Sequence, residues 1–267
     1  MRKSLALFLL IQALSFFIWI SMPKTTSAMA TEPASESTTH EVAQQETSLE
    51  LDFSARNFSE SQISLNATLQ EQIIEAMEVL PSSHAETVEK IILDYNQQAH
   101  RGLGGNNLVI LRGVNMGIKE LVAVLIHETG HNVDYGYLVE KNEDEISEFK
   151  DGNYPLYITD PSIDFYRISW ENETTLKNTS SNLDFVSGYA MSDPFEDFAE
   201  TYVYYVLHNA DFRTLTASSP DLYAKYRFMK YRVFDGVEFD TGDAQVNLNN
   251  RPWDITVLSY DLEELLS

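Results

Sequence analysis

The stretch that most constrains the fold runs from Val122 to Asp134 and reads VAVLIHETGHNVD. It places His127 and His131 four residues apart, with Glu128 directly after the first histidine. The residues just before this motif are apolar nearly all round, which is typical of a buried helix. Residues four apart share one face of a helix, so the two imidazoles can point at a single position.

Two neutral imidazoles at one position suit Zn²⁺, and this is the metal that we expect. Glu128 is rotated about a hundred degrees from His127 around the helix, so it can reach a water at the metal without being a ligand. A carboxylate beside such a water suits a general base. The alternative is a chance match, because the motif is short. The metal site therefore needs support from other parts of the chain.

A second stretch, from Ser187 to Val206, offers a third ligand. Asp193 and Pro194 predict the start of a helix. Glu196 and Glu200 then lie four residues apart on one face of it, although its other positions are mostly apolar. Buried carboxylates must be paired or bound to metal. We therefore predict that Glu196 is the third zinc ligand and that Glu200 fixes a histidine ring or the metal helix.

Two alternatives concern these acids and their neighbours. Glu196 also stands at the third helical position of a capping box that begins at Asp193, which would explain its identity without a metal. The ligand role is favoured because two histidines need a third partner. Asp134, three residues after His131, is better placed to orient a ring or to end the helix than to complete the site.

The two motifs together resemble a known group. H-E-T-G-H at residues 127–131, followed by Y-A-M-S-D-P-F-E-D-F-A-E at 189–200, is similar to the gluzincin-type peptidases related to the catalytic domain of anthrax lethal factor. The secreted bacterial Pro-Pro endopeptidases belong to that group. S-G-Y-A and P-x-E-D-F-A-E-T also resemble a broader set of uncharacterised exported bacterial zinc peptidases. The similarity spans about Leu108 to Leu207 and rests on motif residues only.

The resemblance implies a zincin-like fold and a role for Tyr189. This residue lies seven positions before Glu196, and its hydroxyl would stabilise the oxyanion of the tetrahedral intermediate or protonate the leaving amine. A positioned phenol is a suitable donor for that charge. A packed core tyrosine is the alternative. No residue that sets proline preference in the Pro-Pro group can be matched here, so proline-specific cleavage is not predicted.

The fold class that we expect is α+β and mainly helical, with a small sheet beside the metal-binding helix. Helical spacing predicts helices over residues 65–80 and 88–95. A turn cluster at 101–107 leads into a short β-rich run at 108–111, which is either an edge strand that pairs with substrate or an ordinary core strand. Residues 165–170 are predicted as a strand or pocket-lining segment, and 233–239 as a hairpin turning at Asp-Gly.

The start of the chain predicts export. A basic start, an apolar run and Ala28-Met29-Ala30 indicate a signal peptide at residues 1–30, with a retained N-terminal membrane anchor as the alternative. Residues 31–50 are rich in Thr, Ser, Glu and Gln and predict a disordered leader. The catalytic domain would then occupy residues 51–267. The absence of cysteine fits a bacterial exported protein that folds without disulfides.

Charge narrows the choice of partner. The formal net charge is −23, and the predicted signal peptide carries no acidic residue. Phosphate contacts need clustered Lys and Arg, so nucleic acid is excluded as a partner. We expect a peptide or protein substrate and no stable membrane association after cleavage of the signal peptide. The sequence does not predict an oligomeric state.

These features predict a secreted zinc-dependent endopeptidase in which Glu128 activates a metal-bound water. Two alternatives from other classes remain open. One is a zinc-containing binding protein at the cell surface that has no catalytic activity. The other is a zinc amidase that acts on cell-wall peptides by the same chemistry.

Overall fold

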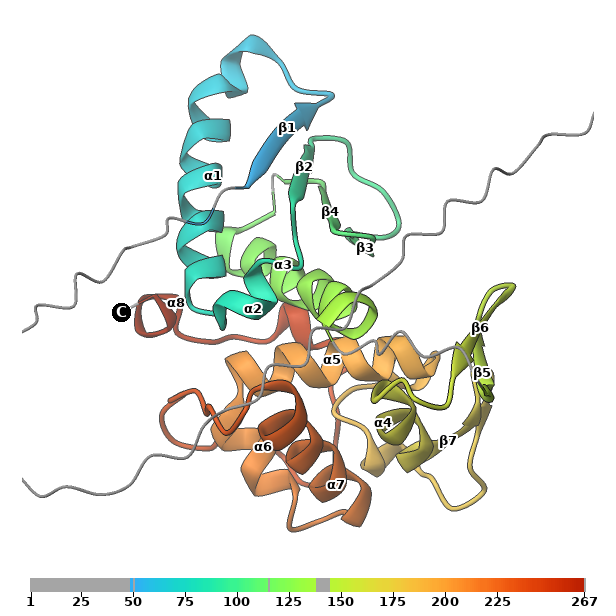
Figure 1. The fold of residues 1–267 in the computed structure, drawn as a ribbon. Coiled ribbons are helices and arrows are strands. Elements are labelled where there is room, and N and C mark those ends of the chain that lie inside the picture. Colours follow the sequence, from blue (N-terminus) through green and yellow to red (C-terminus); the bar gives the residue numbers. More distant parts are fainter. Residues whose placement is uncertain (1–48, 50, 115, 138–144, 267) are drawn as a thin grey trace, which may run out of the picture. The chain divides into compact units, whose positions relative to one another are not determined.

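Two helices, α3 (Ile118–Asn132) and α5 (Pro194–Leu207), pack against each other and carry the two predicted motifs (Figure 1). The computed structural model describes residues 49, 51–114, 116–137 and 145–266. The predicted signal peptide at 1–30 and nearly all of the predicted leader at 31–50 lie outside the described residues. No helix in the described part of the chain has the length and apolarity that a membrane span requires.

The chain before α3 forms a four-stranded sheet in the order β1-β2-β4-β3. β1, β2 and β4 run parallel, and β3 pairs antiparallel with β4 at one edge. Apolar side chains of β2 and β4, such as Leu93 and Val109, are fully buried. The elements are β1 (Asp52–Arg56), α1 (Ile63–Glu78), α2 (Ser82–Ala85), β2 (Lys90–Asp94), β3 (Gly102–Gly105) and β4 (Leu108–Arg112).

The chain after α3 is mostly helical and packs around α5 (Figure 1). Two short hairpins, β5–β6 and β7–β8, accompany α4. The elements are β5 (Ile146–Asp151), β6 (Tyr154–Tyr157), α4 (Ser162–Ser169), β7 (Trp170–Asn172), β8 (Thr175–Leu176), α6 (Asn209–Leu215), α7 (Pro220–Phe228) and α8 (Leu262–Leu265). The described residues thus combine many helices with small sheets, which confirms the predicted α+β class.

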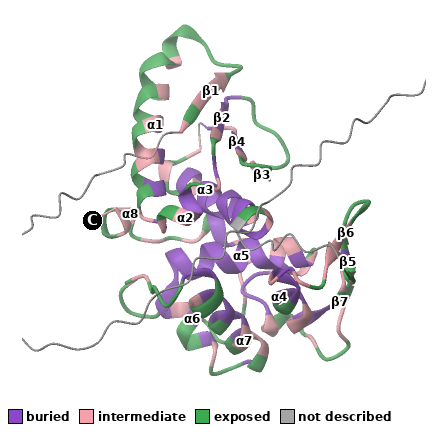
Figure 2. Ribbon diagram, viewed as in Figure 1, coloured by how far each residue is buried: buried purple, intermediate pink, exposed green. Residues whose placement is uncertain are grey.

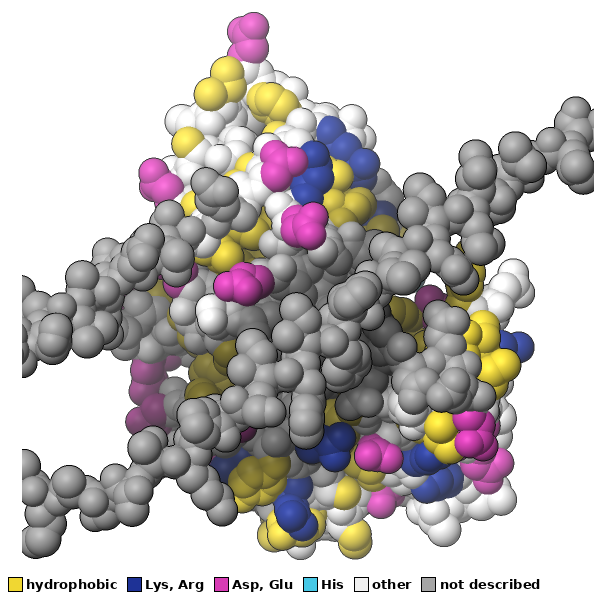
Figure 3. All heavy atoms as spheres, in the orientation of Figure 1, with side chains coloured by type: hydrophobic (Ala, Val, Ile, Leu, Met, Phe, Trp, Pro, Cys, Tyr) yellow, Lys and Arg dark blue, Asp and Glu magenta, His cyan; other side chains and the backbone are white. Residues whose placement is uncertain are grey.

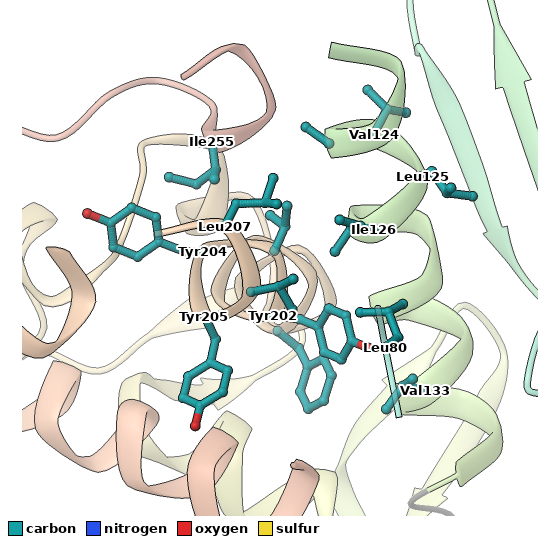
Figure 4. Close-up of a cluster of buried hydrophobic side chains, with 14 of the residues drawn as sticks. Leu80, Val124, Leu125, Ile126, Val133, Tyr202, Tyr204, Tyr205, Leu207 and Ile255 are labelled. Carbon is teal, nitrogen blue, oxygen red and sulfur yellow. The ribbon is translucent and has the colours of Figure 1, made fainter. Parts of the chain in front are cut away.

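The core lies mainly between α3 and α5. Both helices are buried along almost their whole length, whereas α1 presents one exposed face to solvent (Figure 2). Ile126 of α3 and Val133, which directly follows α3, lie opposite Tyr202 and Leu207 of α5 (Figure 4). Burial on this scale stabilises the pair by about 25 cal/mol for each Å² of apolar surface removed from water. The relative position of the two motifs is therefore set by a packed interface.

A buried ion pair fixes the far side of α5. The Asp197 carboxylate accepts hydrogen bonds from Lys225 Nζ of α7 at 2.9 Å and from Trp170 Nε1 at 3.0 Å. Lys225 and Asp197 have no exposed surface. Removing one partner of such a pair leaves an uncompensated buried charge, which costs about 3–5 kcal/mol. The pair therefore holds the rotation of α5 about its axis, which decides where its other face points.

Three predicted elements are wrong. Residues 88–95 are not a helix, because β2 occupies Lys90–Asp94 and pairs with strands on both sides. A short apolar run fits either period, and the β-branched pair Ile91–Ile92 favours the strand. Residues 165–170 belong largely to α4, which starts after Pro161 and does not line the cleft described below. Val233–Phe239 contains no strand, although its Asp-Gly turn has positive φ at both residues.

The two open alternatives for the strand at 108–111 are also decided. β4 has a neighbour on each side, so it is a core strand and not an edge. The two edge strands are β1 and β3, and β3 lies in the predicted turn cluster. Asn106 and Asn107 connect the two strands and have φ values of 52° and 61°. A two-residue hairpin turn of type I′ requires positive φ at both positions, and Asn tolerates it.

His84 and His208 predict how stability depends on pH. Burial lowers the pKa of each imidazole to about 4, from an ordinary value of 6.5. His84 Nε2 lies 2.9 Å from the Val233 carbonyl oxygen, so this nitrogen carries the proton and Nδ1 accepts from the Tyr202 hydroxyl. Between pH 6.5 and 4 the unfolded chain binds protons that the native chain does not. Each histidine therefore removes up to roughly 3 kcal/mol of unfolding free energy as the pH falls through this window.

Urea unfolding at pH 7.5 and pH 5 measures this effect. We expect the loss of stability between the two pH values to be smaller in His84→Gln than in the unchanged chain. His100→Gln is the matched control, because the His100 side chain is exposed. Equal losses in His84→Gln and the unchanged chain would contradict the prediction.

Candidate metal centre

Helix α3 begins at Gly117, which is its N-cap, and runs through the H-E-x-x-H motif to Asn132. His127 and Glu128 are buried and His131 is nearly so. The two imidazole rings meet edge to face, with centroids 5.0 Å apart and planes at 78°. The helical spacing thus brings both rings to one position, as the sequence predicts.

Helix α5 brings Glu196 to the same position. Glu196 Oε2 lies 3.2 Å from His127 Nε2 and 3.6 Å from His131 Nε2. Although burial opposes its ionisation, the two neighbouring imidazoles hold the pKa of the Glu196 carboxyl well below its usual range. Asp193 caps α5 by accepting hydrogen bonds from the backbone N–H groups of Phe195 and Glu196. The Glu196 side chain makes no reciprocal capping contact and faces the histidines instead.

These donor atoms fit a divalent metal. Two ligands that each lie about 2.0–2.1 Å from a tetrahedral Zn²⁺ are about 3.4 Å apart, close to the two distances above. Glu196 Oε2 is buried and accepts no well-oriented hydrogen bond from the described residues. A buried carboxylate oxygen without a donor is costly unless a cation compensates it. Two imidazoles and one carboxylate are also a donor set of catalytic zinc sites.

Glu128 lies beside this group. Donor atoms of His127, Glu128 and His131 all fall within 4.8 Å of one another. Distance alone would therefore allow Glu128 as a ligand. The Glu196 oxygen is the better candidate, because it is within 3.6 Å of both ring nitrogens. Burial raises the pKa of the Glu128 carboxyl, against the opposing effect of the two imidazoles.

The Glu200 carboxylate contacts the His127 ring at Nδ1, the nitrogen that faces away from Glu196. It is fully buried and uses both oxygens. Oε1 lies 3.0 Å from His127 Nδ1, while Oε2 accepts from Ser187 Oγ at 2.6 Å and from the Ile255 N–H at 3.0 Å. A histidine that donates through Nδ1 presents the lone pair of Nε2 to a metal. Glu200 thus selects the tautomer of His127 that a ligand needs.

A change at Glu200 tests this support. Glu200→Gln keeps the shape but places an amide NH₂ where carboxylate oxygens accept three hydrogen bonds. We expect zinc affinity to fall about 10–100-fold, the range typical of such partners. Ser187→Ala removes one of the three donors and should have a smaller effect. Competition with a chromogenic chelator measures both affinities, and an unchanged affinity in Glu200→Gln would contradict the assignment.

Tyr189 lies on the other side of Glu196. Its hydroxyl donates to Glu196 Oε1 at 2.9 Å, and its ring stacks on His127 at a centroid distance of 6.2 Å. Burial, with the nearby carboxylates, raises the pKa of the phenol well above its usual range. The hydroxyl therefore stays protonated and available as a donor. Tyr189 is at the metal centre rather than among the packed core residues.

Asp134 lies just past the end of α3, one of its two predicted roles, and its carboxylate contacts Tyr166 instead of a histidine ring. Its carboxylate is buried and accepts a hydrogen bond of 2.5 Å from the Tyr166 hydroxyl of α4. Burial raises the pKa of Asp134 to about 7. The described residues show no hydrogen bond between Asp134 and the His131 ring. Asp134 links the end of the metal helix to α4.

A cleft of about 1040 Å³ opens onto these residues. Strand β3 forms one wall and approaches Glu128 closely. A Cβ atom added to Gly102 would lie 2.0 Å from Glu128 Oε1, and one added to Gly104 would lie 2.2 Å from the Glu128 carbonyl oxygen. Only glycine fits at either position. The glycine-rich sequence therefore lets an edge strand pass directly over the motif.

Several residues of the site were not predicted from sequence. Ser187, the Ile255 N–H and the two glycines of β3 all contact predicted site residues. Ser187 is the first residue of the S-G-Y-A pattern, so the sequence offered a signal for it. The glycines had a sequence signal only as turn formers. The backbone of Ile255 has no signal, since any residue can supply an N–H.

The fold and donor set define an α+β protein with a buried His-His-Glu cluster suited to a divalent metal. Residues 112–251, more than half of the chain, match the family described as "Putative zinc-binding metallo-peptidase". The chain belongs to this family, which supports the predicted zinc metallopeptidase class. No curated protein matches the chain. The family match includes both motifs and excludes β1, β2, β3 and the residues after Arg251.

Proposed function

We propose that this protein is a zinc-dependent endopeptidase with a zincin-like fold. The observation that carries the proposal is the position of Glu196 Oε2 within 3.6 Å of both imidazole Nε2 atoms. His127, His131 and Glu196 would hold the metal. Bound Zn²⁺ supplies a Lewis acid that lowers the pKa of a water and polarises a carbonyl group. Family membership supports the peptidase class.

Glu128 acts as the general base in this proposal. It accepts a proton from the water that attacks the scissile carbonyl carbon, and it later delivers that proton to the amine as the C–N bond breaks. Burial raises the pKa of the Glu128 carboxyl, which makes the carboxylate a stronger base for the water proton. A catalytic group works best when its pKa lies near the operating pH, because both protonation states are then accessible. The close wall of β3 limits the positions that the carboxylate can adopt.

Tyr189 supports the charged intermediate. Its hydroxyl is protonated and lies beside Glu196, so a small rotation can redirect it to an oxyanion at the metal centre. The spacing of Tyr189, Glu196 and Glu200 also supports a place near the gluzincin peptidases related to anthrax lethal factor.

The edge of β3 would bind the substrate main chain. β3 pairs on one side only, so its other edge offers backbone N–H and C=O groups to an extended peptide. The same strand lines the cleft next to Glu128. This assigns to β3 the substrate-pairing role that the sequence suggested for residues 108–111.

The proposal extends to location and partner. The basic start, apolar run and Ala-x-Ala pattern of residues 1–30 support export. On the face in Figure 3, the described Lys and Arg side chains are interspersed with Asp and Glu and do not gather in one basic patch. This distribution, with the net charge of −23, supports a peptide or protein substrate over a nucleic acid.

Digestion of a mixed peptide library by the zinc-loaded chain, followed by mass spectrometry, tests the function. We expect internal peptide bonds to be cut, activity to disappear with a chelator, and activity to return when zinc is added. Purified cell wall serves as the second substrate. Cleavage of cell wall alone would support an amidase, and bound zinc with no cleavage of either substrate would support a binding protein.

A further inference from the structure

A short segment at residues 252–256, here the C-terminal segment, crosses the metal centre. It reads Pro-Trp-Asp-Ile-Thr and begins directly after the part of the chain that matches the family. It leads into a 3₁₀ turn at Ile255–Val257 that contacts both α3 and α5 (Figure 1). Ile255 lies among the apolar side chains between these two helices (Figure 4).

Backbone hydrogen bonds anchor the C-terminal segment to residues of the site. The Gly188 N–H donates to the Pro252 carbonyl at 2.8 Å, and the Tyr189 N–H donates to the Trp253 carbonyl at 2.7 Å. Two residues later, the Ile255 N–H donates to Glu200 Oε2. The segment is therefore fixed on both sides of Trp253 by groups that also hold the metal centre.

Arg101 holds the segment from the opposite wall. Its guanidinium donates to the Asp254 carboxylate and, at 2.7 Å, to Thr256 Oγ1. It also donates to Glu120 Oε1 of α3 at 2.6 Å. Arg101 directly precedes β3, so the C-terminal segment, the edge strand and the metal helix are tied together. The Asp254 carboxylate, which neighbours Trp253, therefore shares the Arg101 guanidinium with Glu120.

Trp253 is exposed in spite of this anchored backbone. The residue is 71% exposed and lines the cleft. Its ring centroid lies 6.4 Å from that of Tyr189. Gly188 makes this position possible, because a Cβ atom there would come within 2.7 Å of Trp253 Cε3. An uncovered indole on an anchored backbone in a cleft provides a large apolar surface for a ligand.

We propose that Trp253 is a specificity-determining residue whose indole packs against an apolar side chain of the peptide substrate, close to the scissile bond. This inference rests on the proposed peptidase function. Tyr189, which lies between Trp253 and Glu196, places the indole beside the reacting groups. Leu103 of β3 and Tyr154 of β6 line the same cleft and are 51% and 75% exposed. The Asp254 carboxylate next to the indole is bound by Arg101, so the indole is the group at this position that is left open to a substrate side chain.

Cleavage kinetics test the preference. Trp253→Ala and the control Trp253→Phe are compared on peptides that differ at one position near the cut bond. For peptides with an apolar side chain at that position, we expect Trp253→Ala to lower kcat/KM about 10–200-fold, mainly through KM. Trp253→Phe should retain most of the activity, and peptides with glycine there should change little. An equal loss for all peptides would overturn the inference, as would a loss confined to basic side chains.

Tryptophan fluorescence gives a readout that needs no turnover. The sequence has three tryptophans, and Trp19 lies in the predicted signal peptide, so the chain used starts after residue 30. Trp170 is only 2% exposed, so acrylamide should quench mainly Trp253. We expect an apolar peptide to protect this emission in zinc-loaded Glu128→Gln, and Trp253→Phe in the same background to abolish the protected component. Cleavage without protection would overturn the role of Trp253 and leave the peptidase function standing. Protection of the emission without cleavage by any form of the protein would show that Trp253 contacts the peptide and would overturn the peptidase function.

Discussion

Replacing Glu128 by glutamine is expected to lower kcat at least about a thousand-fold, within the range that general acid–base catalysis contributes. The amide has the shape of the carboxylate but cannot take a proton from the attacking water. KM should change little, because the substrate contacts remain. The zinc content should also remain, since His127, His131 and Glu196 are untouched.

The replacement side chain must keep the shape of Glu128, because Glu128 is buried against the glycine-rich strand β3. Gly102 leaves no spare room beside the Glu128 carboxylate, so a larger residue would disturb the wall of the cleft. Glutamine avoids that problem. Glu171→Gln, at an exposed position, is the matched control. Full activity in Glu128→Gln, measured with a fluorogenic peptide, would refute the proposed mechanism.

The second large effect is expected for Glu196→Ala. Without this carboxylate only two imidazoles remain to hold the metal, so zinc affinity should fall by more than the 10–100-fold typical of an outer partner such as Glu200. Peptidase activity at limiting zinc should disappear with it. The hydroxyl of Tyr189 also loses its acceptor, but this change alone does not weaken zinc binding.

Chelator competition and metal analysis measure the effect of Glu196→Ala. The capping of α5 should be unaffected, because Asp193 accepts its hydrogen bonds from backbone N–H groups. Circular dichroism of the zinc-free variant checks that the helices persist. Glu171→Ala is the control for loss of a glutamate. Zinc affinity equal to that of the unchanged chain would show that Glu196 is not a ligand.

The metal centre could be predicted in part because its two motifs are local. Because His127 and His131 are four residues apart, the helical period alone places both on one face. Asp193 is a favoured N-cap residue and Pro194 fits the first turn, so both predict the start of α5. The local structure of each motif can therefore be predicted from its own residues, without knowledge of the tertiary contacts. The same reasoning failed at residues 88–95 and 165–170, where a short apolar run satisfies two periods and only the neighbouring strands or helices decide between them.

By itself the sequence determined the two helices, the residue types that can bind a metal and the α+β class, since periodicity, capping and side-chain chemistry are properties of neighbouring residues. The sequence predicted which of the two stacked glutamates faces the histidines, but the capping role of Glu196 stayed open until the tertiary structure placed its side chain. Glu196 meets them and Glu200 lies behind His127, because the packing of α5 on α3 sets its rotation. It also brought β3 to Glu128 and Trp253 to Tyr189. These contacts join distant parts of the chain through backbone groups and glycines, whose partners depend on how the whole core packs.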